Sequence, residues 1–226
     1  MNTNIKFYLI YTLAYGIILL LGEGIYRLLK GGPAWSRSFA HLSAGVITLP
    51  FPWLFASHWW VLILSLQSCL VLWLTSRLKI LPSHHRIAVK SVGSYLFFVS
   101  VYLCFLASLS TGRKELFVVP LLLLSFSDVA AAQVGRRVGK RTVPGGRSWH
   151  GNTKTLAGST AFFMTALPVL FFSFFHYLNW NLTAIVLMTL LTASLSTTME
   201  AYSPFGTDNF SVPFIVLIIM HLSLFL

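Results

Sequence analysis

Eight long apolar stretches divide this chain of 226 residues and leave almost no room for a water-soluble domain. Only 9% of the residues are charged, whereas a soluble domain carries roughly 25%. Most stretches approach the roughly 20 residues that an α-helix needs to cross a bilayer. With no break in composition and no internal repeat, the sequence predicts one integral membrane domain over residues 1–226, an all-α polytopic transmembrane bundle of about 7–8 spans. The stretches are 5–26, 39–56, 59–76, 91–110, 115–134, 155–176, 179–199 and 210–226.

The boundaries of these spans differ in clarity. The first stretch has no small-residue cleavage site, and Glu23 and Arg27 follow it, so we expect a retained span and not a signal peptide. Only Ser57-His58 separates the second stretch from the third, and the last stretch is short. For these, a re-entrant segment is the alternative to a full span.

The sixteen basic residues are distributed unequally across the predicted bundle. If all eight stretches span, the loops after the first, third, fifth and seventh share one side, and Lys6, Arg113 and Lys114 are left on the other. Cytoplasmic loops are enriched in Lys and Arg, so we expect the basic loops in the cytoplasm and both termini on the opposite side. Topology and anionic lipids account for this charge, which argues against nucleic acid binding. The basic side holds Arg27, Lys30, Arg37, Arg77, Lys79, Arg86, Lys90, Arg136, Arg137, Lys140, Arg141, Arg147 and Lys154.

Three of the five acids are predicted to meet at the basic face. Asp128 lies inside an apolar helix, where a carboxylate is costly and therefore marks a candidate functional site. Glu200 and Asp208 lie in the last loop on the same side. Together they could bind Mg²⁺ and join it to phosphate oxygens. The structural alternatives are a salt bridge from Asp128 to an arginine and helix capping by the two loop acids.

A basic, glycine-rich loop follows Asp128 with the sequence GRRVGKRTVPGGRSWHGNTK, residues 135–154. Flexible backbone, cations and a helix N-terminus are the features that bind a polyphosphate. The loop is not a P-loop, because Asn152-Thr153 stands where Lys-Ser/Thr is required. We expect Asn152 or Thr153 to cap a helix that opens at Lys154. An ordinary basic loop is the alternative.

Two further patterns lie beside these elements. Arg37, His41 and Gly45 are four residues apart and share one helix face, where His41 could act as a general base or as an ordinary hydrogen-bonding residue. Ala131 and Gly135 follow Asp128 on one face. Such small residues allow a close helix contact, and they also leave room for a ligand.

In combination, these elements resemble the phytol kinase and dolichol kinase family, membrane enzymes that phosphorylate isoprenoid alcohols with CTP and are related to phosphatidate cytidylyltransferase. The resemblance runs from about residue 37 to 213 in four ordered elements. The matching residues are Arg37, His41 and Gly45; Asp128, Ala131, Gly135, Arg136, Gly139 and Lys140; Lys154, Thr155, Gly158 and Ser159; and Glu200, Asp208, Asn209, Val212 and Pro213.

The chain departs from the family pattern at three positions. Ser38 replaces a lysine, Ser127 replaces a glycine, and Ala157 replaces a glutamate beside the expected phosphate site. The middle element also resembles phosphatidate cytidylyltransferase, whose later His-Gly-Gly element is absent. A CDP-lipid synthase is therefore one alternative, and a non-catalytic lipid-binding or transport protein is another.

The resemblance and the residue patterns together give a set of expected roles. We expect a kinase that uses CTP, or ATP as the alternative, and Mg²⁺ to phosphorylate an isoprenoid alcohol at the cytoplasmic face. The catalytic residues are expected to be Asp128, His41 and Lys154; the nucleotide and phosphate ligands Arg37, Gly135, Arg136, Gly139, Lys140, Gly158 and Ser159; and the metal ligands Asp128, Asp208 and Glu200.

Overall fold

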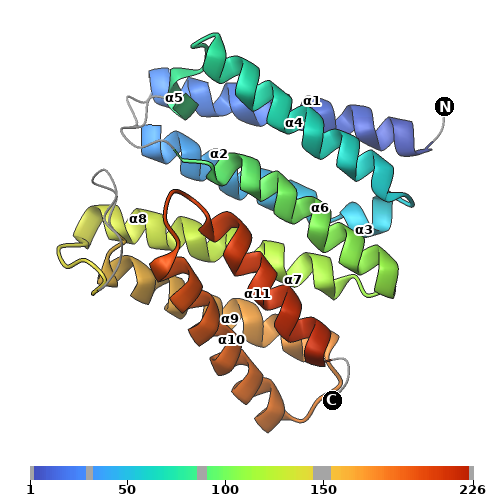
Figure 1. The fold of residues 1–226 in the computed structure, drawn as a ribbon, viewed down its shortest axis with the longest axis vertical. Coiled ribbons are helices and arrows are strands. Elements are labelled where there is room, and N and C mark those ends of the chain that lie inside the picture. The colour runs from blue at the N-terminus through green and yellow to red at the C-terminus, as the bar shows by residue number, and fades with distance from the viewer. Residues whose placement is uncertain (1–2, 29–32, 86–90, 145–153, 224–226) are drawn as a thin grey trace.

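The computed structural model describes residues 3–28, 33–85, 91–144 and 154–223, and within these ranges the chain is helical with no β-sheet. Figure 1 shows the long helices lying side by side in one bundle. The all-α fold class is thus confirmed. The elements are α1 (Thr3–Leu28), α2 (Pro33–Thr48), α3 (Phe51–Leu54), α4 (His58–Arg77), α5 (Pro82–His85), α6 (Gly93–Thr111), α7 (Glu115–Leu123), the π-helical turn η1 (Leu124–Asp128), α8 (Val129–Val138), α9 (Leu156–Tyr177), α10 (Leu182–Tyr202) and α11 (Asp208–Leu222).

Among the described residues, six helices are long and apolar enough to cross a membrane. They are α1, α4, α6, the continuous helix Glu115–Val138, α9 and α10. The other two predicted stretches give shorter helices, since α2 has 16 residues and α11 has 15. The stretch 39–56 is divided because a helix rarely continues into the residue before a proline, and Pro50 ends α2 and begins α3.

The direction of the helices follows the predicted alternation. In Figure 1 the C-terminal ends of α1, α4, α8 and α10 lie at one end of the bundle, together with the starts of α2, α6, α9 and α11. The first turn of α1 and the last turn of α11 lie toward the opposite end. The helix ends that flank the basic loops therefore lie together, and the assignment of this end of the bundle to the cytoplasm stays a prediction.

Large apolar side chains cover the outside of the bundle. Leu13, Leu20, Phe172 and Leu187 are all more than 60% exposed. A soluble protein rarely leaves so many large apolar groups in water. The outer surface therefore supports an integral membrane protein.

The interior of the bundle is built around α7, whose Leu116, Phe117 and Leu121 are completely buried. This helix continues into η1, which ends at Asp128. Single π turns inside α-helices are frequent at functional sites. Gly45 of α2 packs directly on this turn, because a Cβ at position 45 would lie 1.8 Å from Ser125 Oγ.

Candidate active site

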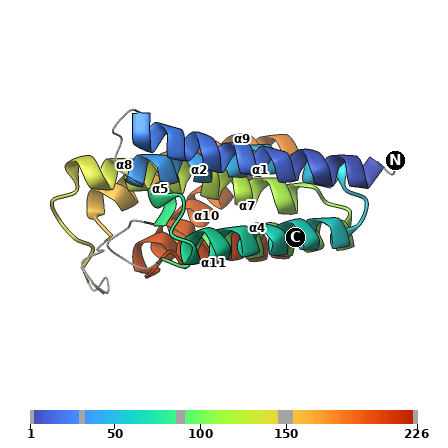
Figure 2. The ribbon, with the colours of Figure 1, turned by 90° about the horizontal axis from the view of Figure 1, so that it is seen from above.

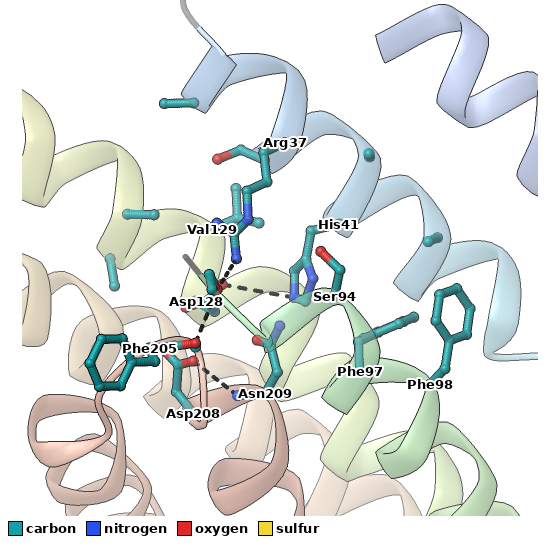
Figure 3. A pocket seen from close by; sticks show the side chains of 18 of the residues that line it. Arg37, His41, Ser94, Phe97, Phe98, Asp128, Val129, Phe205, Asp208 and Asn209 are labelled. Carbon is teal, nitrogen blue, oxygen red and sulfur yellow. Dashed lines mark hydrogen bonds and ion pairs between the residues drawn. The ribbon is translucent and has the colours of Figure 1, made fainter. Parts of the chain in front are cut away.

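A cavity of about 450 Å³ extends from the basic end into the bundle. Figure 3 shows the side chains of Arg37, His41, Asp128 and Asp208 converging in it. Residues from all four elements of the sequence pattern thus meet in one place. The predicted residues that line the cavity are Arg37, His41, Asp128, Gly135, Arg136, Lys154, Gly158, Glu200 and Asp208.

Lys154 forms the centre of the charged cluster. Its ammonium donates to Glu200 Oε1 at 2.6 Å and to Asp208 Oδ2 at 2.5 Å. The second oxygen of Glu200 accepts from Ser159 Oγ at 3.0 Å, and the second oxygen of Asp208 accepts from the Asn209 backbone N–H at 3.0 Å. The two carboxylates are therefore held on one cation, near the start of α9, the end of α10 and the start of α11.

The charge of Lys154 is set by these neighbours. Burial alone lowers its pKa, but the negative charges of Asp208, Glu200 and Asp128 more than offset burial, so the pKa of Lys154 is raised above its ordinary value. These carboxylates thus favour the charged form of the side chain. Since it is still 31% exposed to the cavity, it remains available to an anion.

Asp128 and His41 face each other across the cavity. Asp128 Oδ2 lies 3.8 Å from His41 Nε2, which is longer than a hydrogen bond. His41 Nε2 is buried and finds no hydrogen-bond partner in the described part of the chain. The His41 ring packs edge-on against Phe97, with centroids 5.1 Å apart. In the described part of the chain, the ion-pair neighbour of Asp128 is His41. The salt bridge from Asp128 to an arginine, which is the alternative to a functional role for this acid, is not observed there.

Two arginines bring further positive charge to the cavity. Arg37 Nη2 donates to Ser91 Oγ at 2.7 Å, and Arg136 Nη2 donates to Ser38 Oγ at 3.1 Å. Both hydroxyl partners are neutral, so these bonds orient the guanidinium groups without neutralising them. Ser38, which departs from the family pattern, thus has a clear contact. Sequence reasoning missed Ser91, because nothing distinguishes it from other serines in a membrane protein.

The glycines near Asp128 serve helix packing. A Cβ at Gly158 would lie 3.0 Å from the Ala131 carbonyl oxygen, and one at Gly135 would lie 2.9 Å from Thr155 Oγ1. The close approach of α8 and α9 that the small residues predicted is therefore confirmed. Gly139, which follows the last residue of α8, has the same role, since its Cβ would lie 2.5 Å from Thr155 Oγ1 and 2.8 Å from Thr155 Cβ at the start of α9.

The start of α9 differs from its prediction. The helix begins at Leu156, and its N-cap is Thr155, whose Oγ1 accepts from the Gly158 N–H at 3.1 Å. The predicted opening of the helix at Lys154 with an Asn152 or Thr153 cap is wrong, because antiparallel backbone bonds hold Lys154 in extended chain: the Val143 N–H donates to the Lys154 carbonyl at 3.0 Å. Asn152, Thr153 and the predicted phosphate-binding glycines 145, 146 and 151 lie outside the described residues.

Some predicted ligands do not line the cavity. Gly139, Lys140 and Ser159 are absent from its walls, and Ser159 instead supports Glu200. Ala157, which stands where the family pattern has glutamate, does not line the cavity either. Sequence reasoning also missed the apolar extension of the cavity beyond His41. The residues that form it have the same apolar character as those of any membrane helix.

Comparison with known proteins adds one relative. The chain is 29% identical over 202 residues to a phytol kinase of Synechocystis sp. (strain ATCC 27184 / PCC 6803 / Kazusa), and the match covers 88% of this chain and 83% of that protein. No protein-family model and no solved structure matches the chain. The similarity therefore extends over most of the chain.

Proposed function

We propose that this protein is a membrane kinase that transfers the γ-phosphoryl group of CTP to a long-chain isoprenoid alcohol. The observation that carries the proposal is that one cavity joins a cluster of acids and cations at the basic end to an apolar compartment inside the bundle. A lipid alcohol needs both environments, because its hydroxyl must meet a nucleotide while its tail stays out of water. The similarity to a phytol kinase supports the same class of substrate. CTP as the donor follows from the family resemblance, with ATP as the alternative.

The carboxylates fit a role in binding Mg²⁺. No group of three metal-ligating side chains is found among the described residues. Mg²⁺, however, is usually held by one or two carboxylates together with substrate phosphates. Asp128 and Asp208 both face the cavity and would hold the ion, which when bound offsets charge on the transferring phosphoryl group. Glu200, which shares Lys154 with Asp208 and also lines the cavity, is the third expected ligand, and both acids would exchange part of their bonding to Lys154 for the ion.

The cations would bind the nucleotide, and His41 would accept the proton of the alcohol. Lys154, Arg37 and Arg136 bind the triphosphate and stabilise the charge that develops during transfer. The hydroxyl oxygen of the alcohol attacks the γ-phosphorus, the bond from that phosphorus to the β-phosphate oxygen breaks, and CDP leaves. His41 Nε2, which has no other hydrogen-bond partner in the described structure, accepts the hydroxyl proton.

The direct test uses the purified protein in lipid with Mg²⁺ and CTP labelled at the γ-phosphate. Phytol, geranylgeraniol and a polyprenol serve as acceptors, and phosphatidic acid is the control. Label in an isoprenyl monophosphate with release of CDP supports the proposal. Release of pyrophosphate with phosphatidic acid, and no labelled alcohol, would instead identify a CDP-lipid synthase. Competition by unlabelled ATP measures the choice of nucleotide base.

A further inference from the structure

The apolar part of the cavity lies between the first helices of the chain. Beyond His41, its wall is formed by Phe97 and Phe98 of α6 and by Tyr15 and Gly16 of α1. Figure 3 shows the two phenylalanines on the side of His41 that faces away from Asp208. Leu72 and Val71 of α4 complete the wall. A chain attached to a hydroxyl at His41 would therefore run into a compartment bounded by α1, α2, α4 and α6.

The far end of this compartment is closed by polar side chains. Gln67 Nε2 donates to Thr12 Oγ1 at 3.3 Å, and Tyr8 Oη donates to Gln67 Oε1. These bonds join α1 to α4, which run in the same direction (Figure 2). From Leu19 to Thr12, both in the wall, α1 rises about 10 Å at its usual rise per residue. That depth is less than the length of an extended geranylgeranyl chain.

The wall of the compartment along α1 and α4 leaves free space. Val71 of α4 lines the cavity and is 36% exposed, so the neighbouring helices do not cover it. Gly16 lies in the wall on α1, and a Cβ at this position would meet nothing within 4 Å. The contrast with Gly45, where a Cβ would overlap Ser125, shows that Gly16 does not serve helix packing. Its missing side chain leaves space open in the cavity.

We propose that this compartment binds the hydrocarbon tail of the alcohol and that Gly16 is a specificity-determining position that admits long tails. The first isoprene units pack against Phe97, Phe98 and Leu72, and the rest of the tail passes Gly16 and leaves between α1 and α4. This inference rests on the proposed kinase function, because it assigns the tail of that substrate. A branched side chain at position 16 would fill the passage while the catalytic groups at Asp128 and Lys154 stay untouched.

The experiment compares Gly16→Leu with Gly24→Leu. Gly24 is a matched control because it lies on the same helix, a Cβ there also meets nothing within 4 Å, and it does not line the cavity. We expect Gly16→Leu to lower kcat/KM for geranylgeraniol by roughly tenfold or more, since a blocked methylene site costs about that factor. With the short alcohol isoprenol, Gly16→Leu should match the wild type. Gly24→Leu should match the wild type with both alcohols. Equal losses with both alcohols in Gly16→Leu, or no loss with either, would overturn the assignment.

A binding measurement separates this inference from the proposed function. A geranylgeraniol analogue with a diazirine at its far end is photolysed with each protein, and the labelled peptides are identified by mass spectrometry. We expect label on α1 and α4 in the wild type and Gly24→Leu, and much less in Gly16→Leu. Label that Gly16→Leu does not change, or that falls on α9 and α10, would contradict the tail site. If labelling follows the expected pattern but no alcohol is phosphorylated, the kinase proposal fails and the tail site stands.

Discussion

Glycines have opposite roles on the two sides of the cavity. On the side of α8 and α9, glycines bring backbones together: Gly135 and Gly158 have no room for a Cβ without a close contact. On the side of α1, a Cβ at Gly16 would meet nothing within 4 Å. The same residue type thus closes one wall and leaves the other open.

The difference reflects what each wall has to do. The charged cluster must be held in fixed positions, because electrostatic stabilisation depends on groups that do not reorganise. Lys154, Glu200 and Asp208 are accordingly bound to one another and to α9. A flexible hydrocarbon needs volume and not fixed polar contacts. The predictions below test this division, from the largest expected effect to the smallest.

Asp128→Asn should abolish phosphoryl transfer. The neutral amide keeps the shape of the side chain but removes the charge that faces the cavity, and a loss of roughly a thousandfold is expected for such a group. The labelled-CTP assay measures it, with size-exclusion elution as the check on folding. Glu115→Gln is the matched control, because Glu115 is a buried acid at the other end of the same continuous helix, paired with Arg113 at 2.5 Å. Activity of Asp128→Asn within tenfold of the control would exclude Asp128 from the chemistry.

Lys154→Ala should destabilise the fold as well as weaken nucleotide use. It leaves Glu200 and Asp208, whose side chains are 2% and 7% exposed, buried without their cation. Removing one partner of a buried ion pair costs about 3 kcal/mol or more. The thermal midpoint in detergent, followed by tryptophan fluorescence, should fall clearly.

Two further proteins decide whether this loss comes from the carboxylates. Lys154→Ala combined with Glu200→Gln should recover part of the stability, because one uncompensated charge is gone. Lys114→Ala, which removes a cation stacked on Trp53 at the other end of the bundle, should have little effect on stability. If the double variant is no more stable than Lys154→Ala, repulsion between the carboxylates is not the cause.

Gly45→Ala should destabilise the protein, whereas Gly24→Ala should not. The new Cβ at position 45 would lie 1.8 Å from Ser125 Oγ, and overpacking of this kind costs about 1–3 kcal/mol. At position 24 the methyl group meets open space, and alanine is the better helix former. Thermal midpoints of the two variants give the comparison, and Gly45→Ala with Ser125→Gly should regain stability. Equal midpoints for the two single variants would contradict the packing described for η1.

Glu23→Gln should have the smallest effect, and only on stability. Glu23 Oε2 accepts from the Ser83 backbone N–H at 3.1 Å, and Oε1 accepts from Arg27 Nε at 2.5 Å. The acid thus fixes α5 to α1 and does not line the cavity. Weakening these bonds should cost about 1 kcal/mol with kcat unchanged. A loss of kcat at constant stability would place a second acidic centre in the reaction.

Much of the fold and part of the site could be predicted from the chain. Each apolar stretch forms helix, because the backbone N–H and C=O groups of a segment in lipid must bond to one another. Asp128, His41 and Lys154 could be selected because charged or titratable groups are rare in such a sequence. The helix lengths were less predictable, since Pro50 shortened α2 and the first turn of α9 used Thr155 as its cap.

The sequence by itself determined that the chain forms apolar helices and which few charged residues could carry chemistry, because both follow from the cost of polar groups in lipid. The tertiary structure alone decided how these residues pair. Lys154 meets Glu200 and Asp208 across 46 and 54 positions, and Arg37 meets Ser91 across 54. It also decided which glycine is packed and which one opens the cavity, since Gly16 and Gly45 differ only in what the neighbouring helices place beside them.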